Sequence, residues 1–303
     1  MSKPVMQHII PRVYLKEFQI DTTSNKSCVY CLDFSNQYNS EIQKVGLNDR
    51  VFKEKKYYND SGYTDPFTIE KMFASEVEPL YDLIMQNIKE ESNLSEQVRE
   101  HILVWTFVSQ CRGQYLRRNT ERVMTEIIKF QNLYNKKHLN VEQQLQLDAY
   151  IKQTSKDIQL GIFSDNEQLE KLSTLHSETL TSKHWRILMA PQGHHFLTND
   201  NPGFSANMDP RFNVQRPFLP LMELNGDSVM YYVFSPVYCL EIRPFFEGTP
   251  LEINALNMEI KYEVIGSEYV DLINQGVVYT KYKLLISHSN KLIERFIPNA
   301  PDK

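Results

Sequence analysis

The chain has 303 residues, of which 41% are hydrophobic, and a formal charge of −5 at pH 7. This hydrophobic fraction can bury a large core, which excludes a disordered chain, and the negative charge argues against a protein that coats DNA regardless of sequence. Only 10 residues are glycine, and neither the dinucleotide-binding fingerprint nor the Gly-Lys-Ser/Thr phosphate loop is present. The sequence contains no window as apolar as a membrane span and no signal-peptide core, so we expect no membrane contact and a cytoplasmic location.

The first segment, residues 1–62, predicts a short helix and a small β element. Tyr14 and Phe18 recur at helical spacing after Pro11, whose missing N–H costs nothing in the first turn of a helix. Alternating runs at residues 27–33 and, more weakly, 50–58 predict strands.

The four cysteines do not make a complete zinc-binding pattern. Cys28 and Cys31 have the spacing of half a zinc site, but Cys111 and Cys239 stand alone. Residues three apart on a strand point to opposite faces, so we expect buried free thiols rather than a metal pair.

The second segment, residues 66–180, predicts helices. An apolar stripe from residue 66 to 88 is interrupted at Pro79, where a helix either kinks or begins anew. Ser95 predicts the N-cap of the next helix, which we expect to be the longest, and Gly113 within its pattern predicts a bend or a close helix crossing. Further amphipathic stretches cover residues 141–160 and 166–180.

The last segment, residues 184–303, predicts mainly strands. Strand-like runs occupy residues 184–189, 195–198, 229–234, 238–242 and 284–287, whereas residues 252–275 return to a helical pattern. We predict a single interleaved α+β domain over residues 1–303. Its helical middle packs on a mixed or antiparallel sheet, built mainly from the C-terminal half plus N-terminal strands.

Several polar residues stand at predicted helix ends. His8 precedes the first helix, whose dipole would lower its pKa and keep it neutral as a base or metal ligand, unless it merely caps or packs. Glu78 precedes the interruption at Pro79. Gln110 and Arg112 end an apolar run, and Arg112 is suited either to grip a phosphate or to pair with a core acid such as Glu78.

A further candidate lies after the strand at residues 195–198. Asn199 and Asp200 follow that strand, where metal-binding carboxylates often lie, although Asn and Asp before proline also form turns without chemistry. Residues 112–137 hold seven basic and two acidic residues, and Arg117 and Arg118 are among the basic ones. They predict a positive helix that follows a nucleic-acid backbone.

Three of these motifs match signatures of a known family. Residues 8–18 read His-x-x-Pro-x-x-Tyr-Leu-x-x-Phe, a Gln-x-Arg run ends at Arg112, and Thr198 to Pro202 read Thr-Asn-Asp-Asn-Pro. They resemble the domain of unknown function 4238 family, with Asn199 in place of its usual serine, over nearly the whole chain. The resemblance implies a bacterial protein, and the association of some members with phage defence would suit a toxin or nuclease; no mechanism follows from it.

Two functions compete. In the first, the protein is a metal-dependent hydrolase or nuclease that acts on nucleic acid or nucleotides in phage defence. Its predicted residues are Glu78 and Asp200 as ligands of Mg²⁺ or Mn²⁺, His8 as base or ligand, Arg112 on phosphate, and Gln110, Arg117, Arg118 and Asn199 on the substrate. In the second, it is a non-catalytic sensor or interaction protein that binds nucleic acid or an acidic protein partner. The convergence of four polar positions from distant segments favours the first.

Overall fold

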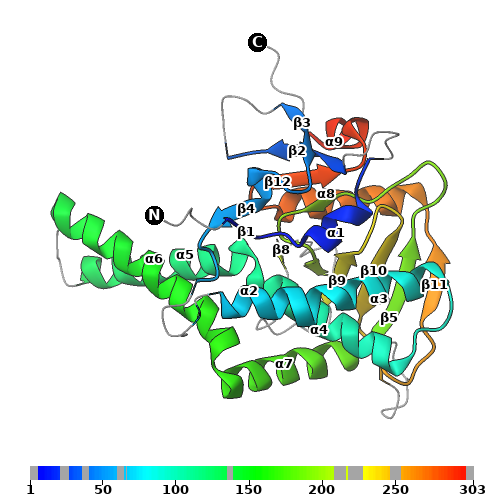
Figure 1. The fold of residues 1–303 in the computed structure, drawn as a ribbon, viewed down its shortest axis with the longest axis horizontal. Coiled ribbons are helices and arrows are strands. Elements are labelled where there is room, and N and C mark those ends of the chain that lie inside the picture. The colour runs from blue at the N-terminus through cyan, green and yellow to red at the C-terminus, as the bar shows by residue number, and fades with distance from the viewer. Residues whose placement is uncertain are drawn as a thin grey trace.

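The computed structural model describes residues 6–20, 27–35, 41–59, 65, 67–134, 139–207, 216–217, 228–245 and 254–297. Within these ranges, helices occupy the middle of the chain and the sheets come mainly from its C-terminal half, joined by N-terminal strands (Figure 1). The predicted α+β fold class is therefore confirmed.

The larger sheet has the strand order β11-β5-β10-β9-β7-β8 among the described residues, and only its β11–β5 pair is parallel. The central strands β9 and β10 are buried almost throughout, which explains their nearly continuous apolar runs. The helix predicted over residues 252–275 is wrong for the described residues before Ser267: residues 254–260 form turns, and the short alternating run at 261–264 pairs with the edge of β5. The strands are β5 (His184–Met189), β7 (Phe204–Asn207), β8 (Arg216–Pro217), β9 (Ser228–Val233), β10 (Tyr238–Arg243) and β11 (Lys261–Val264).

The smaller sheet combines strands from three distant parts of the chain. In the described residues its order is β3-β2-β12-β6, and β12 lies between β2 and β6, so that Leu285 stands opposite both Leu32 and Asn199. Its strands are β2 (Cys28–Asp33), β3 (Ile42–Gly46), β6 (Thr198–Asn199) and β12 (Leu284–Ser287), and a separate pair joins β1 (Met6–His8) to β4 (Lys53–Lys55).

The helix α4 is the central helix of the fold. Every residue from Trp105 to Arg112 is buried, as expected of a helix surrounded by other elements. Its N-cap is Ser95, whose Oγ accepts the N–H of Val98 at 3.3 Å, and Gly113 separates it from α5, so both predictions are confirmed.

The remaining helices largely follow the predicted pattern. The interruption before Pro79 is a π-helical turn, which lets the chain pass from α2 to α3. The expectation that α4 is the longest helix is wrong, because α6 has 24 residues and α4 has 17. The helices are α1 (Arg12–Glu17), η1 (Arg50–Phe52), α2 (Thr68–Met72), η2 (Phe73–Val77), α3 (Glu78–Lys89), α4 (Glu96–Arg112), α5 (Gln114–Tyr134), α6 (Val141–Ser164), α7 (Asn166–Thr181), α8 (Ser267–Thr280) and α9 (Asn290–Phe296).

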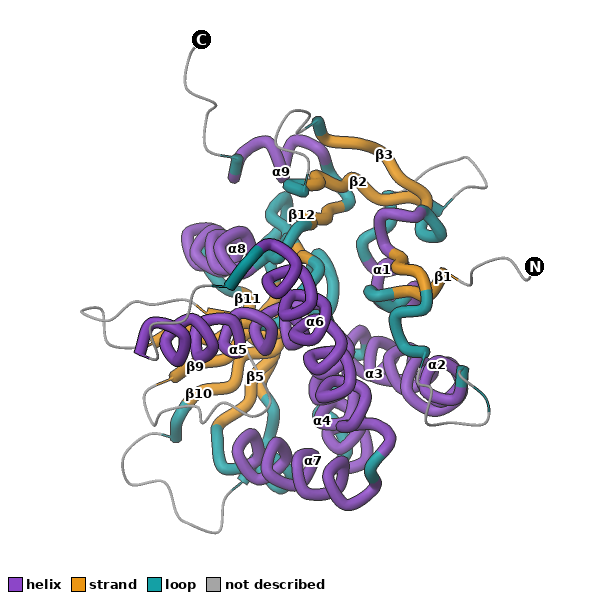
Figure 2. Tube along the Cα trace, turned by 90° about the vertical axis from the view of Figure 1, so that its left-hand side faces the viewer, coloured by secondary structure: helices purple, strands orange, loops and turns teal. Residues whose placement is uncertain are grey.

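The helices α5 and α6 run out from the rest of the molecule as a long hairpin (Figure 1), which points towards the viewer in Figure 2. None of the helices in the described ranges has the length and apolar character needed to cross a membrane. All four cysteines are buried, as predicted.

Candidate functional site

Arg112 lies at the end of α4 and links three separate segments. Its guanidinium donates to Glu78 Oε1 at 3.3 Å, to the Tyr58 hydroxyl at 3.3 Å and to the backbone oxygen of His8 at 3.1 Å. Its side chain is only 4% exposed and lies over the ring of Phe73. Of the two roles that the sequence left open for Arg112, these contacts correspond to the ion pair that holds elements together.

The structure brings His8 and Glu78 to Arg112, but His8 takes part through its backbone. The His8 side chain is partly buried, and burial together with Lys53 lowers its pKa to about 4. The predicted direction of this shift therefore agrees with the structure, although burial causes it rather than a helix dipole. The neutral imidazole leaves Nε2 without a hydrogen-bond partner among the described residues.

Asp200 follows β6 and holds the chain just before β12. Its two carboxylate oxygens accept the N–H groups of Tyr282 and Lys283 at 2.9 and 2.7 Å. Burial raises the pKa of Asp200 to about 6, and the backbone hydrogen bonds oppose that rise. The carboxylate therefore holds the backbone in place just before β12.

The neighbouring predicted residues Asn199 and Gln110 are buried. The Asn199 amide donates to the backbone oxygen of Val277 at 2.6 Å and accepts the N–H of Asn201 at 2.7 Å. The amide of Gln110 has no hydrogen-bond partner within the described structure, and its Nε2 would lie 3.2 Å from a Cβ at Gly203. Neither side chain is available to a ligand in solution.

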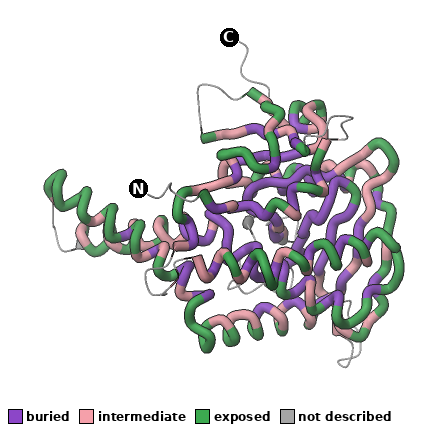
Figure 3. The backbone as a smooth tube through the Cα atoms, in the orientation of Figure 1, coloured by how far each residue is buried: buried purple, intermediate pink, exposed green. Residues whose placement is uncertain are grey.

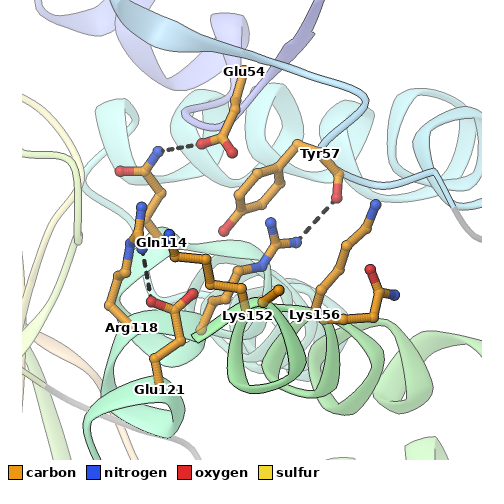
Figure 4. Close-up of a pocket in the computed structure, with 10 residues that line it drawn as sticks. Glu54, Tyr57, Gln114, Arg118, Glu121, Lys152 and Lys156 are labelled. Carbon is orange, nitrogen blue, oxygen red and sulfur yellow. Dashed lines mark hydrogen bonds and ion pairs between the residues drawn. The ribbon is translucent and has the colours of Figure 1, made fainter. Parts of the chain in front are cut away.

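Arg117 and Arg118 line a pocket of about 330 Å³ between the bases of α5 and α6, which we call the α5–α6 pocket (Figure 4). Arg117 is held by Gln159 at 2.8 Å and by the backbone oxygen of Tyr57 at 3.0 Å. Arg118 pairs with Glu121 at 2.7 Å and remains 41% exposed. Figure 4 shows Glu54 on the opposite wall, bonded to Gln114.

A second pocket of about 420 Å³ adjoins the first, and we call it the Asp200 pocket. Glu54, Gln114 and Arg118 line both pockets, so that one continuous polar surface runs from α6 to the start of β12. Glu78 and Arg112 are not among the residues that line it. The structure therefore brings His8 and Glu78 to Arg112, and it places Arg117, Arg118 and Asp200 along this surface. The buried side chains of Gln110 and Asn199 belong to neither group.

The combined surface is positive although the chain is acidic. Seven basic and four acidic side chains line it. In the part of the chain that the structure describes, Arg50, Lys53 and Lys152 make no ion pair. The basic residues are Arg50, Lys53, Arg117, Arg118, Lys152, Lys156 and Lys283, and the acidic ones are Asp33, Glu54, Glu121 and Asp200.

Sequence reasoning missed most of these pocket residues. Arg50 and Lys53 lie around η1 and β4, Lys152 lies on α6 and Lys283 precedes β12. No local motif joins them, because only the packing of distant segments brings them together. The one usable signal was the charged run near residue 53.

The predicted metal ligands have other partners. Glu78 pairs with Arg112, and both oxygens of Asp200 accept backbone N–H groups. Within the described ranges, no three His, Cys, Asp or Glu side chains are grouped so as to hold a metal ion. These residues do not fit a Mg²⁺ or Mn²⁺ site held by Glu78 and Asp200 without rearrangement, so we derive no step through a metal.

Much of the positive charge predicted for residues 112–137 is already engaged. Arg112 and Arg117 are buried, Arg118 pairs with Glu121, and Lys129 pairs with Glu126 at 2.9 Å. Lys136 and Lys137 lie outside the described residues. Within the described part of this stretch, most basic side chains are therefore buried or paired rather than presented along α5.

Comparison with known proteins identified a family. A protein-family model described as "Protein of unknown function (DUF4238)" covers residues 6–293. No curated protein matches the chain. No solved structure matches it either.

Proposed function

We propose that this chain, which belongs to the DUF4238 family, binds the phosphate groups of nucleic acid or a nucleotide along the α5–α6 and Asp200 pockets. The observation that supports this most is that three basic side chains lining these pockets, Arg50, Lys53 and Lys152, make no ion pair with any described residue, on a protein whose overall charge is negative. Phosphate oxygens are the ligands that such side chains bind best. The resemblance to proteins associated with phage defence suggests the setting, which is recognition or destruction of nucleic acid.

The polar lining favours a charged ligand over an apolar one. Arg118 lies where the two pockets meet, so one ligand could place a phosphate there and extend into both. The acidic side chains of Glu54 and Glu121 hold Gln114 and Arg118 in position by hydrogen bonds of 2.9 and 2.7 Å. Groups positioned in this way bind with less loss of side-chain freedom.

Binding is tested with a double variant that removes one lysine side chain from each pocket. Lys53→Gln/Lys152→Gln is compared with Lys171→Gln/Lys261→Gln, which removes two exposed lysines elsewhere. We expect fluorescence anisotropy with labelled single-stranded DNA, duplex DNA and tRNA to show at least about tenfold weaker binding for the first variant. The slope of log affinity against log salt concentration should become shallower by about two, because two lysine–phosphate contacts are lost. Equal affinity for the two variants would exclude this surface.

Hydrolysis is the second candidate, and its supporting observation is that the Asp200 carboxyl lines the same pocket as Arg118. Wild type and Asp200→Asn are incubated with the same nucleic acids and with nucleotides, in Mg²⁺ or Mn²⁺. Turnover that is lost in the variant, while ligand binding persists, assigns Asp200 to catalysis. Binding without turnover in wild type leaves the non-catalytic sensor as the function.

A further inference from the structure

The outer part of the α5–α6 hairpin has no interior of its own. From Arg118 to Tyr150, no residue whose burial is described is buried. Figure 3 shows the hairpin reaching outward with most of its surface exposed. Two helices alone bury only the faces they turn to each other, so any other apolar face stays in water.

Such an exposed apolar face runs along α5. Val123, Ile127 and Phe130 follow one another at intervals of four and three residues, and they are 47%, 52% and 71% exposed. We call these three residues the α5 stripe. At about 100° per residue, Arg118 and Glu121 lie roughly 140–160° around the helix from Val123. The α5 stripe therefore lies on the side of α5 away from the α5–α6 pocket.

The charges beside the α5 stripe are balanced. Between residues 121 and 133 the helix carries two acidic and two basic side chains, Glu121, Arg122, Glu126 and Lys129. A helix that lies on a membrane surface is rich in Lys and Arg on its polar face. The other two basic residues of α5, Arg117 and Arg118, lie near its base and are held by Gln159 and Glu121, so the charge beside the stripe itself stays balanced. Balanced charges suit a surface that binds a copy of itself.

We propose that a second copy of this chain docks on the α5 stripe, with the two α5 helices antiparallel about a two-fold axis near Ile127. Glu126 and Lys129 lie on the same flank of the stripe and pair within the helix at 2.9 Å. In an antiparallel pair, each Glu126 faces the Lys129 of the other copy. A two-fold contact of this kind is self-complementary and closed.

The apolar area is close to what a weak dimer needs. Leu133, further along α5, is also exposed, at 79%. If the α5 stripe and Leu133 contribute roughly 100 Å² per side chain, the two copies bury roughly 800 Å² of apolar surface, and the polar side chains beside the stripe bring the contact close to the lower limit of about 1,000 Å² for specific contacts. We therefore expect a reversible dimer.

Sedimentation velocity over a wide concentration range tests this with Ile127→Glu, and with Leu175→Glu as the matched control. Ile127 and Leu175 are both about half exposed and both lie on helices, but Leu175 lies on α7 rather than on α5. We expect wild type and Leu175→Glu to dimerise with increasing concentration, and Ile127→Glu to remain monomeric with an unchanged circular dichroism spectrum. A monomeric wild type, or a dimer that Ile127→Glu does not weaken, overturns the proposal.

The charge register is tested separately. Lys129→Glu should weaken the dimer by at least about tenfold, and Glu126→Lys/Lys129→Glu should restore it because each pair is then reversed. Failure of the double variant to restore the dimer excludes the antiparallel arrangement. Binding of monomeric wild type to phosphatidylserine vesicles, lost in Ile127→Glu, would assign the stripe to a membrane surface and also overturn the proposal.

Discussion

Among single residues, Asp200 combines a structural contact with an unusual titration. Its folded pKa of about 6 is above its ordinary value of 3.8. Between these values the folded chain holds a proton that the unfolded chain has lost, so this group adds to the free energy of unfolding as pH falls and loses that contribution as pH rises through about 6. Relative to the non-titrating Asp200→Asn variant, we expect wild type to gain about 1 kcal/mol between about pH 7.5 and pH 5.

Urea unfolding of both proteins at the two pH values measures this difference. Asp33→Asn removes another carboxylate that lines the Asp200 pocket and serves as the control. A difference between wild type and Asp200→Asn that does not change with pH would mean that Asp200 is ionised in the folded protein at both pH values.

Arg112 gives the second prediction for a single residue. Arg112→Lys keeps the charge but cannot reach Tyr58, Glu78 and the His8 carbonyl together, so we expect the free energy of unfolding to fall by about 2–4 kcal/mol. A double-mutant cycle of Arg112→Met with Glu78→Gln should give a coupling energy of about 1 kcal/mol or more by urea unfolding. A coupling energy near zero would show that the hydrogen bonds to Tyr58 and to the His8 carbonyl fix the Arg112 guanidinium with little contribution from Glu78.

At the scale of elements, α1 is joined to both sheets by one hydroxyl. The Tyr14 hydroxyl lies 2.5 Å from Thr198 Oγ1 on β6 and donates to the backbone oxygen of Val233 on β9 at 2.8 Å. Tyr14→Phe leaves both buried groups short of a partner, so we expect a loss of about 1–3 kcal/mol in urea unfolding. Tyr279→Phe on α8, where the side chain is 69% exposed, should change stability by less than about 0.5 kcal/mol. Similar losses in the two variants would contradict this role of α1.

Elements with a local signal could be predicted from the sequence, whereas those defined by packing could not. Ser95 caps α4 through its own side chain and Gly113 ends α4 through its own backbone, and both predictions are confirmed. The strand at residues 261–264 exists because β5 offers an edge to pair with, which no short window of sequence contains. The helix α6 continues one turn beyond the predicted end at residue 160, because Ile162 and Phe163 after Gly161 extend its buried face.

The same distinction between local signals and packing explains which residues of the candidate site could be predicted from the sequence. Arg112 and Asp200 stand out in the sequence because polar residues at the ends of apolar runs are unusual, and they prove to be tied into the core. Lys53 and Lys152 lie in ordinary polar surroundings in the sequence. They can be recognised as pocket residues only in the folded chain, where β4 and α6 line the Asp200 and α5–α6 pockets.

For the whole molecule, the strand order bears on whether residues 1–303 unfold as one unit. In the smaller sheet β12 pairs with both β2 and β6, so segments near the two ends and the middle share one set of backbone hydrogen bonds. Tyr14 then connects this sheet to β9 in the larger one. A chain connected in this way cannot lose one segment without exposing the core of another, which favours cooperative unfolding.

The two tryptophans of the chain report on its two halves. Trp105 is buried in α4 and Trp185 is buried in β5, at 1% and 0% exposure. In Trp105→Phe and in Trp185→Phe, the remaining tryptophan follows one region while far-UV circular dichroism follows the whole chain. We expect the fluorescence and dichroism midpoints in urea to coincide within each variant, because the helical and sheet regions share one core. Separate midpoints in either variant would show that the helical middle and the larger sheet unfold as distinct domains, and the prediction of a single interleaved domain would then be wrong.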